Sequence, residues 1–106
     1  MKNDKKIQEM NIIEQNLQNI LFQKQAFELE KDETLSALNE IEKSDDEVFK
    51  IIGQLMIKTE KSKIKKELEE KEKILDLRIS AFEKQESYLK EKMDKIREEL
   101  ADSVQE

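Results

Sequence analysis

Two long segments without proline or glycine flank one short β-like stretch, and this arrangement does most to limit what the chain can fold into. The first segment runs from about Lys5 to Lys43, and the second runs from about Ser62 to Val104. The stretch between them, Val48 to Lys58, contains the only glycine, Gly53. Because proline and glycine are the strongest helix breakers, each long segment is predicted to be one uninterrupted helix. The chain should then fold back on itself at the short stretch.

Apolar residues recur every seven positions in both long segments, as they do in coiled coils. In the first segment, one row consists of Ile13, Ile20, Phe27, Thr34 and Ile41, and the complementary row contains Met10, Leu17 and Leu38. In the second segment, one row consists of Leu68, Leu75, Phe82, Leu89 and Ile96, and the other row contains Ile79, Met93 and Leu100. The pattern predicts a mostly α fold: an antiparallel two-helix coiled coil whose helices are joined by a β-hairpin.

Lys24 and Lys31 fall in the complementary row of the first segment. Lysine in a seam weakens packing but restricts register and partner, because its stem lies along the seam while the ammonium reaches water. The alternative is a seam that shifts, so that Leu21 and Leu35 occupy those layers. The sequence leaves both arrangements open.

Two polar clusters each have a plain and a sharper interpretation. Eight Asn or Gln residues lie between Gln8 and Gln25, which is either an ordinary solvated face or an adhesive surface of low charge. Four lysines lie where the second helix should begin: Lys61, Lys63, Lys65 and Lys66. Their positive charge is unfavourable at the N-terminus of a helix, which is the positive end of the helix dipole. Nearby acidic residues largely cancel these lysines, so we place them on a solvated face rather than in a phosphate site.

The short stretch has the pattern of a β-hairpin, with Gly53 supplying a positive φ at the first turn position. A two-residue turn at Gly53–Gln54 pairs Ile52 with Leu55, Ile51 with Met56, and Lys50 with Ile57. One face of the hairpin then carries Val48, Ile52, Leu55 and Ile57, and the other carries Phe49, Ile51 and Met56. The hairpin is therefore apolar on both faces.

A hairpin of this kind cannot bury its side chains alone. Seven large apolar side chains represent about 10 to 20 kcal/mol of burial energy that a two-stranded ribbon cannot collect by itself. Its edges also leave backbone groups unpaired. Hairpins from several chains that join into shared sheets or barrels would meet both needs, and the predicted assembly residues are Val48, Phe49, Ile51, Ile52, Gly53, Leu55, Met56 and Ile57. The alternative, a hairpin folded onto its own helix ends, would hide one face at most.

Antiparallel pairing should place Ile7, Met10 and Ile13 alongside Ile96, Leu100 and Val104. Helix ends fray, so apolar side chains there are buried only intermittently. We expect Ile13 and Ile96 to be the last layers of the coil. The residues predicted to contact another molecule lie nearest the open end: Ile7, Met10, Ile12, Leu100 and Val104.

Composition narrows the classes of protein. With 36% hydrophobic and 43% charged residues, the chain is too polar for a conventional globular core and too periodic for disorder, so residues 1–106 are predicted to form one elongated domain. A net charge of −6 disfavours binding to nucleic acid, because the phosphate backbone is also negatively charged. The apolar stretch Ile51–Ile57 is too short to span a membrane, Met1–Met10 is too polar for a signal peptide, and the absence of cysteine fits a reducing cytoplasm.

Catalysis is not expected. Histidine and cysteine are absent, so the usual general base, zinc ligand and thiol nucleophile are missing. A single glycine rules out both the P-loop and the dinucleotide-binding fingerprint. The carboxylates are expected on exposed helix faces, where they lack the burial that would shift their pKa values toward catalytic use. We therefore predict that the chain is not an enzyme and that it has neither a metal site nor a cofactor.

The chain resembles a known family, the beta-class subunits of prefoldin, a hexameric holdase chaperone of archaea and eukaryotes. The matching stretches are QKQAFELEKDETLSALNEIEK from Gln23 to Lys43, EVFKIIGQLMIK from Glu47 to Lys58, and ELEEKEKILDLRISAFEKQESYLKEKM from Glu67 to Met93. The order of the pieces carries the resemblance: a KQ-E-E-ET-AL run, a K-x-x-G-x-x-x-x-K hairpin over about residues 47–59, and a long helix with a KQE triplet. Phe49 departs from the tyrosine that such subunits commonly carry.

The resemblance implies a complex of two alpha-type and four beta-type subunits, in which the hairpins build a β-barrel body and the coiled coils extend from it. Such complexes hold unfolded polypeptide clients at the coiled-coil tips and pass them to a group II chaperonin without using ATP. Many weak contacts from several tips can add through avidity. The rival hypothesis is a structural or scaffolding coiled-coil protein whose ends bind one specific partner.

Overall fold

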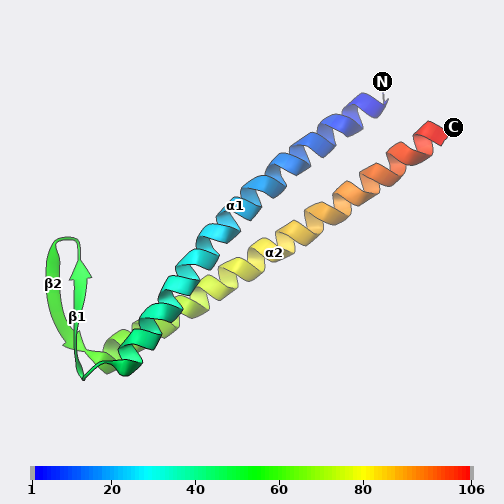
Figure 1. Cartoon of the computed structure of the whole chain (residues 1–106). Coiled ribbons are helices and arrows are strands. Elements are labelled where there is room, and N and C mark those ends of the chain that lie inside the picture. The colour runs from blue at the N-terminus through cyan, green and yellow to red at the C-terminus, as the bar shows by residue number, and fades with distance from the viewer. Residues whose placement is uncertain (1, 106) are drawn as a thin grey trace. The chain divides into compact units, whose positions relative to one another are not determined.

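The computed structural model describes residues 2–105, and the side chains of residues 3–103. The chain forms a helix α1 (Lys2–Lys43), two strands β1 (Glu47–Ile52) and β2 (Leu55–Glu60), and a helix α2 (Lys61–Gln105). Figure 1 shows this order along the chain, in which the hairpin follows α1 and precedes α2. The predicted class, two long helices joined by a β-hairpin, is confirmed. Helix α1 begins three residues before the predicted start, and α2 extends one residue beyond the predicted range at each end.

The chain divides into two units, and α1 and α2 contribute to both. Unit 1 comprises residues 1–26 and 79–106, and unit 2 comprises residues 27–78, including the whole hairpin. That residues 1–106 form one domain therefore stays a prediction. Each unit contains part of the seam between α1 and α2, and each is described separately below.

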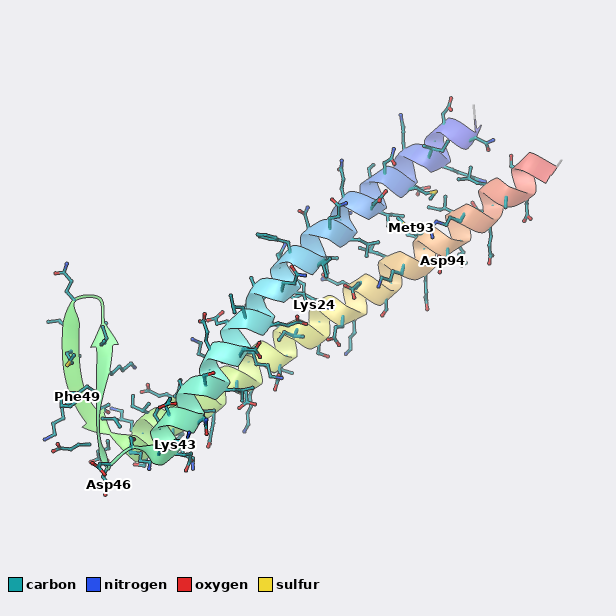
Figure 2. The ribbon with its side chains drawn as sticks, in the orientation of Figure 1. Lys24, Lys43, Asp46, Phe49, Met93 and Asp94 are labelled. Carbon is teal, nitrogen blue, oxygen red and sulfur yellow. The ribbon has the colours of Figure 1, made fainter. Side chains whose placement is uncertain are left out.

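The core of unit 1 is a small apolar cluster between the helices. Ile13, Met93 and Ile96 are buried, and four half-buried residues pack against them: Met10, Leu17, Leu89 and Leu100. Met93 lies on the side of α2 that faces α1 (Figure 2). As predicted, Ile13 and Ile96 are layers of the coil. All seven residues belong to the predicted heptad rows, so the 3.5-residue repeat selects the buried side correctly.

Lys24 resolves the choice between a seam with lysine and a shifted seam. The Lys24 side chain is 16% exposed and pairs with Glu86, which is 17% exposed, at 3.4 Å. Leu21, which would have replaced it, is 45% exposed. The seam of unit 1 therefore contains a half-buried ion pair where a shifted heptad would have placed leucine.

Unit 2 repeats this arrangement around Thr34 and Leu75, which are both buried. The Thr34 hydroxyl donates to the carbonyl of Glu30 at 2.8 Å, which satisfies it inside the seam. Lys31 pairs with Asp76 at 2.6 Å, whereas Leu35 stays exposed. The lysine seam thus holds in this unit as well.

The hairpin has the predicted register. Ile52 pairs with Leu55, Ile51 with Met56, and Lys50 with Ile57, and the ladder continues to Glu47 and Glu60. Gly53 has φ 58°, and no other described residue has a positive φ. A positive φ at the first turn position alone is the pattern of a type II′ turn, whose twist suits a two-residue hairpin.

The joint between the helices and the hairpin is held by polar contacts. Ser44 follows the last residue of α1, and its hydroxyl donates to the Ile41 carbonyl at 2.7 Å. The Lys61 backbone N–H donates to the Asp46 carbonyl at 3.2 Å, and the Lys61 ammonium donates to the carbonyls of Glu42 and Ser44 at 3.3 and 3.0 Å. These carbonyls lie at or just beyond the C-terminus of α1, where a cation is favourable.

The lysines at the start of α2 correct one sequence-based expectation. Lys63 and Lys66 are exposed, as a solvated face requires. Lys61 and Lys65 are instead half-buried, and Lys65 pairs with Glu42 of α1. The expectation was wrong for these two because it considered α2 alone. The hairpin brings the end of α1 beside the start of α2, so an unfavourable charge for one helix dipole is favourable for the other.

Candidate binding surfaces

The hairpin presents apolar side chains on both faces. The register places Ile52, Leu55 and Ile57 on one face and Phe49, Ile51 and Met56 on the other, and these six side chains are 44 to 69% exposed. Phe49 projects from β1 in Figure 2. Because both faces are open, the alternative in which the hairpin folds onto its own helix ends is excluded. Of the predicted assembly residues, only Val48 is partly covered.

One ion pair links the hairpin to α2 and another joins its two strands, and the apolar faces stay open. The Lys50 ammonium lies 2.9 Å from a carboxylate oxygen of Glu67 on α2, and Lys58 pairs with Glu47 across the strands. The hydrogen bond from Lys50 lowers the pKa of Glu67, and the hydrogen bond from Lys65 lowers the pKa of Glu42. Lys65 itself has a raised pKa, first because of its hydrogen bond to Glu42. The joint therefore favours the charged forms of Glu42, Glu67 and Lys65.

The residues predicted for the open end of the coil divide into three groups. Ile7 and Ile12 are 48 and 58% exposed, so they are available to a binding partner. Met10 and Leu100 pack against the buried cluster of unit 1. The side chain of Val104 lies outside the described residues. Two polar contacts lie among these residues: Ser103 donates to Asn3 at 3.1 Å, and Lys6 lies 3.3 Å from Glu99.

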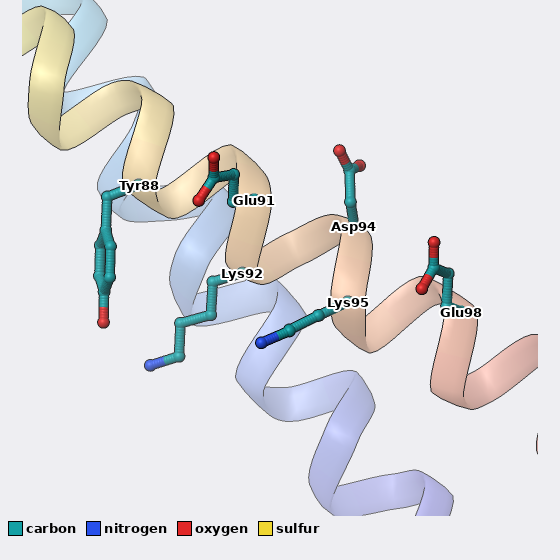
Figure 3. A pocket seen from close by; sticks show the side chains of 6 residues that line it. All are labelled: Tyr88, Glu91, Lys92, Asp94, Lys95 and Glu98. Carbon is teal, nitrogen blue, oxygen red and sulfur yellow. The ribbon is translucent and has the colours of Figure 1, made fainter.

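Sequence reasoning missed several apolar side chains that are exposed along the helices. They are Phe22 and Leu29 on α1, and Ile74, Leu77 and Tyr88 on α2. None belongs to the predicted heptad rows, so the pattern could have identified them as outward-facing residues. A hollow at Tyr88 is lined by six residues that all come from α2 (Figure 3), so it is the outer face of one helix: Tyr88, Glu91, Lys92, Asp94, Lys95 and Glu98.

A groove in unit 2 lies between α1 and α2. Arg78 sits over the ring of Phe27, 5.7 Å from its centroid, and both residues line the groove. Most of the other lining residues are charged: Glu30, Glu67, Glu70 and Lys71, beside Ile74 and Leu75. The part of the chain that the structure describes has no group of three acidic residues placed to hold a metal ion. Nor does either described helix have a stretch long and apolar enough to cross a bilayer.

Comparison with known proteins gives one consistent result. Residues 4–106 match the family model for prefoldin subunits. The chain is 39% identical to prefoldin subunit beta of Thermococcus onnurineus over 89 residues, which cover 82% of this chain and 77% of that protein. It is 35% identical to prefoldin subunit beta of Pyrobaculum islandicum over 96 residues, covering 89% and 77% of the two chains.

A solved structure shows the same fold. The crystal structure of the prefoldin beta subunit from Thermococcus strain KS-1 is similar with a TM-score of 0.94 and 34% sequence identity, covering 99% of this chain and 94% of that one. The element order, the hairpin and the relatives therefore lead to one conclusion. The chain belongs to the prefoldin subunits, a family of chaperone subunits, and within them to the beta class.

Proposed function

We propose that this chain is a beta-type subunit of an ATP-independent holdase. In this proposal it assembles with alpha-type subunits and other beta copies into a hexamer of two alpha and four beta chains in the cytoplasm. The hairpins form a shared β-barrel body, and the coiled-coil ends hold non-native polypeptides and hand them to a group II chaperonin. Family membership supports the chaperone role.

The exposure of both hairpin faces is the observation that carries the assembly part of the proposal. Six large apolar side chains lie open on a two-stranded ribbon, and two open strand edges accompany them. Contiguous apolar surface of this kind marks an interaction site. An interface formed by strand edges supplies hydrogen bonds as well as apolar contact, and other hairpins of the same kind offer both.

Client binding is assigned to the end of the coil in unit 1. Ile7 and Ile12 are exposed there and can contact apolar side chains of an unfolded polypeptide. Met10 and Leu100 become available when the terminal turns open. The contacts near them, Asn3 with Ser103 and Lys6 with Glu99, are surface polar interactions, which contribute little to stability. Opening of this end is therefore easy.

Light scattering tests the holdase function directly. A chemically unfolded substrate is diluted from denaturant, without ATP, in the presence of this chain co-expressed with an alpha-type subunit. We expect suppression of aggregation by the wild type and weaker suppression by the double variant Ile7→Ser/Ile12→Ser. The matched control is Leu29→Ser/Leu77→Ser, which removes two apolar residues of unit 2 that are more exposed than Ile7 and Ile12. Absence of suppression by the wild-type complex would favour the scaffolding alternative.

A further inference from the structure

One groove on unit 1 is lined without any charged residue. It has a volume of about 410 Å³ and lies between the two helices. Its lining consists of Asn16, Asn19, Ile20 and Gln23 from α1, and Gln85, Tyr88 and Leu89 from α2. Four of these seven residues are amides. The groove therefore gathers part of the Asn/Gln-rich run of α1 and adds a glutamine from the opposite helix.

The absence of charge distinguishes this groove from its surroundings. In the whole chain, 43% of residues are charged. Four other hollows on the described residues are each lined by charged side chains, including the groove that contains Phe27 and Arg78. A neutral lining does not select an anion or a cation, so it favours an occupant that is itself uncharged.

The chemistry of the lining matches that of a polypeptide backbone. A carboxamide carries a carbonyl acceptor and N–H donors, which are the groups of a peptide bond. Among the described side chains, none of the four amides has a hydrogen-bond partner. Half-buried Ile20 and Leu89 add an apolar surface beside them, and the ring of Tyr88 is 63% exposed.

The spacing of the amides also suits an extended chain. Asn16 and Gln23 are seven residues apart on α1, which corresponds to roughly 10 Å along the helix axis. An extended polypeptide rises about 3.3 Å per residue. The groove therefore spans about three residues of an extended segment, enough for several backbone hydrogen bonds.

We propose that this groove binds an extended, uncharged segment of a non-native polypeptide through its backbone. Asn19, Gln23 and Gln85 exchange hydrogen bonds with the segment's N–H and C=O groups, and Tyr88 packs against its side chains. The proposal rests on the holdase function and deepens it, because it adds a second kind of recognition to the apolar tip. Backbone groups are present in every unfolded chain, so this grip does not depend on client sequence.

Tyr88 makes the groove directly observable. The chain has one tyrosine and no tryptophan, so its tyrosine fluorescence comes from Tyr88 alone. Tyr88 lines this groove and also the hollow on the outer face of α2, so the amide variants below are needed to assign a response to the groove. The probe is a 12-residue peptide of Ser, Thr and Val with blocked ends, which carries neither charge nor fluorescence. The comparison peptide has the same sequence with N-methyl groups on alternate residues, which remove backbone donors. Each peptide is titrated into the full chain.

We expect the plain peptide to change Tyr88 emission saturably and to bind about tenfold tighter than the N-methylated peptide. In the variant Asn19→Leu/Gln23→Met/Gln85→Met, shape and neutrality are kept but the amides are lost, so this tenfold preference should vanish. The matched control Asn11→Leu/Gln15→Met/Gln18→Met replaces the same residue types outside the groove lining and should keep the preference.

Three results would overturn the proposal: no Tyr88 response, equal binding of both peptides, or a preference that survives in the triple variant. If the triple variant does not fold, as judged by its helical circular dichroism, the wild-type comparison of the two peptides still decides. The light-scattering assay separates this inference from the holdase function. Suppression of aggregation by the wild type, together with equal peptide binding, would refute the groove alone.

Discussion

At the scale of single residues, Gly53 is the position where backbone conformation decides the fold. Its φ of 58° lies in the left-handed region, where a Cβ is unfavourable by about 1–2 kcal/mol. A Cβ added at this position would meet no atom within 4 Å, so any effect of substitution is conformational rather than steric.

We predict that Gly53→Ala destabilises the hairpin by about 1–2 kcal/mol, and that Gly53→Asn has a smaller effect because asparagine tolerates a positive φ better. Amide hydrogen exchange of the strands measures the free energy of hairpin opening in each variant. Equal losses in the alanine and asparagine variants would show that the turn does not depend on this backbone conformation.

Thr34 is the one buried polar residue that the structure describes in the seam. Its hydroxyl shares the Glu30 carbonyl with the helical hydrogen bond, so replacing it leaves no buried group unpaired. We predict that Thr34→Val raises the free energy of unfolding by about 0.5–1 kcal/mol, and that Thr34→Ser lowers it by about 0.8 kcal/mol through loss of a methyl group. Urea unfolding checks both directions, and a destabilised valine variant would contradict this account.

At the scale of elements, the seam between α1 and α2 contains the ion pair of Lys24 and Glu86. A half-buried ion pair contributes little net free energy to folding, because both charges lose water when they are buried. Removing one partner is nevertheless destabilising, because the other charge stays partly desolvated without a partner. Lys90, which is mostly exposed, lies 3.8 Å from Glu86 and also contacts this carboxylate. In unit 1 the pair interrupts an otherwise apolar seam, so its role there can be to select the register of the helices rather than to stabilise them.

We therefore predict that Glu86→Gln lowers the free energy of unfolding by about 1 kcal/mol, whereas the double variant Lys24→Met/Glu86→Leu restores or exceeds the wild-type value. Urea unfolding of the wild type, Lys24→Met, Glu86→Leu and the double variant completes the cycle. A double variant less stable than either single variant would show that the pair contributes net stability.

The joint between helices and hairpin should respond to acid. The folded pKa values of Glu42 and Glu67 are lowered by hydrogen bonds from Lys65 and Lys50, so their contribution to stability is present above the unfolded pKa and is lost as pH falls through the lower folded value. The unfolded value for glutamate is about 4.3. Lys31 and Lys65 have raised pKa values, so their contribution is lost only as pH rises above about 10.4.

We predict that the unfolding temperature falls as the pH drops below the ordinary glutamate pKa of about 4.3, and that Glu42→Gln/Glu67→Gln flattens part of this dependence. Thermal melts followed by circular dichroism at stepped pH provide the measurement. The effect should be small because both carboxylates, Glu42 and Glu67, are solvent-exposed. An unchanged acid profile in the double variant would place the sensitivity elsewhere in the chain.

At the scale of the whole molecule, apolar surface is divided between burial within the chain and exposure on the hairpin. The heptad residues turn toward the seam in each unit, whereas the hairpin leaves six large apolar side chains open. Exposed side chains do not contribute to the stability of the isolated chain. Changes on the hairpin should therefore alter association without altering the helices.

We predict that Ile52→Asp/Leu55→Asp reduces the oligomer to smaller species while the helical content per residue stays the same. These residues face each other across the register, so two carboxylates there place like charges on the proposed interface. Analytical ultracentrifugation and circular dichroism of the same samples are compared. An oligomer of unchanged size would mean that the hairpin is not the assembly element.

The sequence by itself determined the elements, the hairpin register and the buried apolar residues of the seam. The heptad repeat identified Ile13, Met93 and Ile96 as buried, and the single glycine between β-like residues located the turn, because both signals depend on periodicity and backbone conformation over short distances. Family resemblance rested on the same short stretches, and the comparisons confirmed it.

Only the tertiary structure decided how residues from different helices combine. It chose Lys24 over Leu21 because Glu86 lies opposite, and it gave Lys61 and Lys65 partners at the end of α1. It also joined the amides of α1 with Gln85 and Tyr88 in one neutral groove. These pairings connect residues far apart along the chain, and a pattern within one helix contains no information about which side chain faces it from the other.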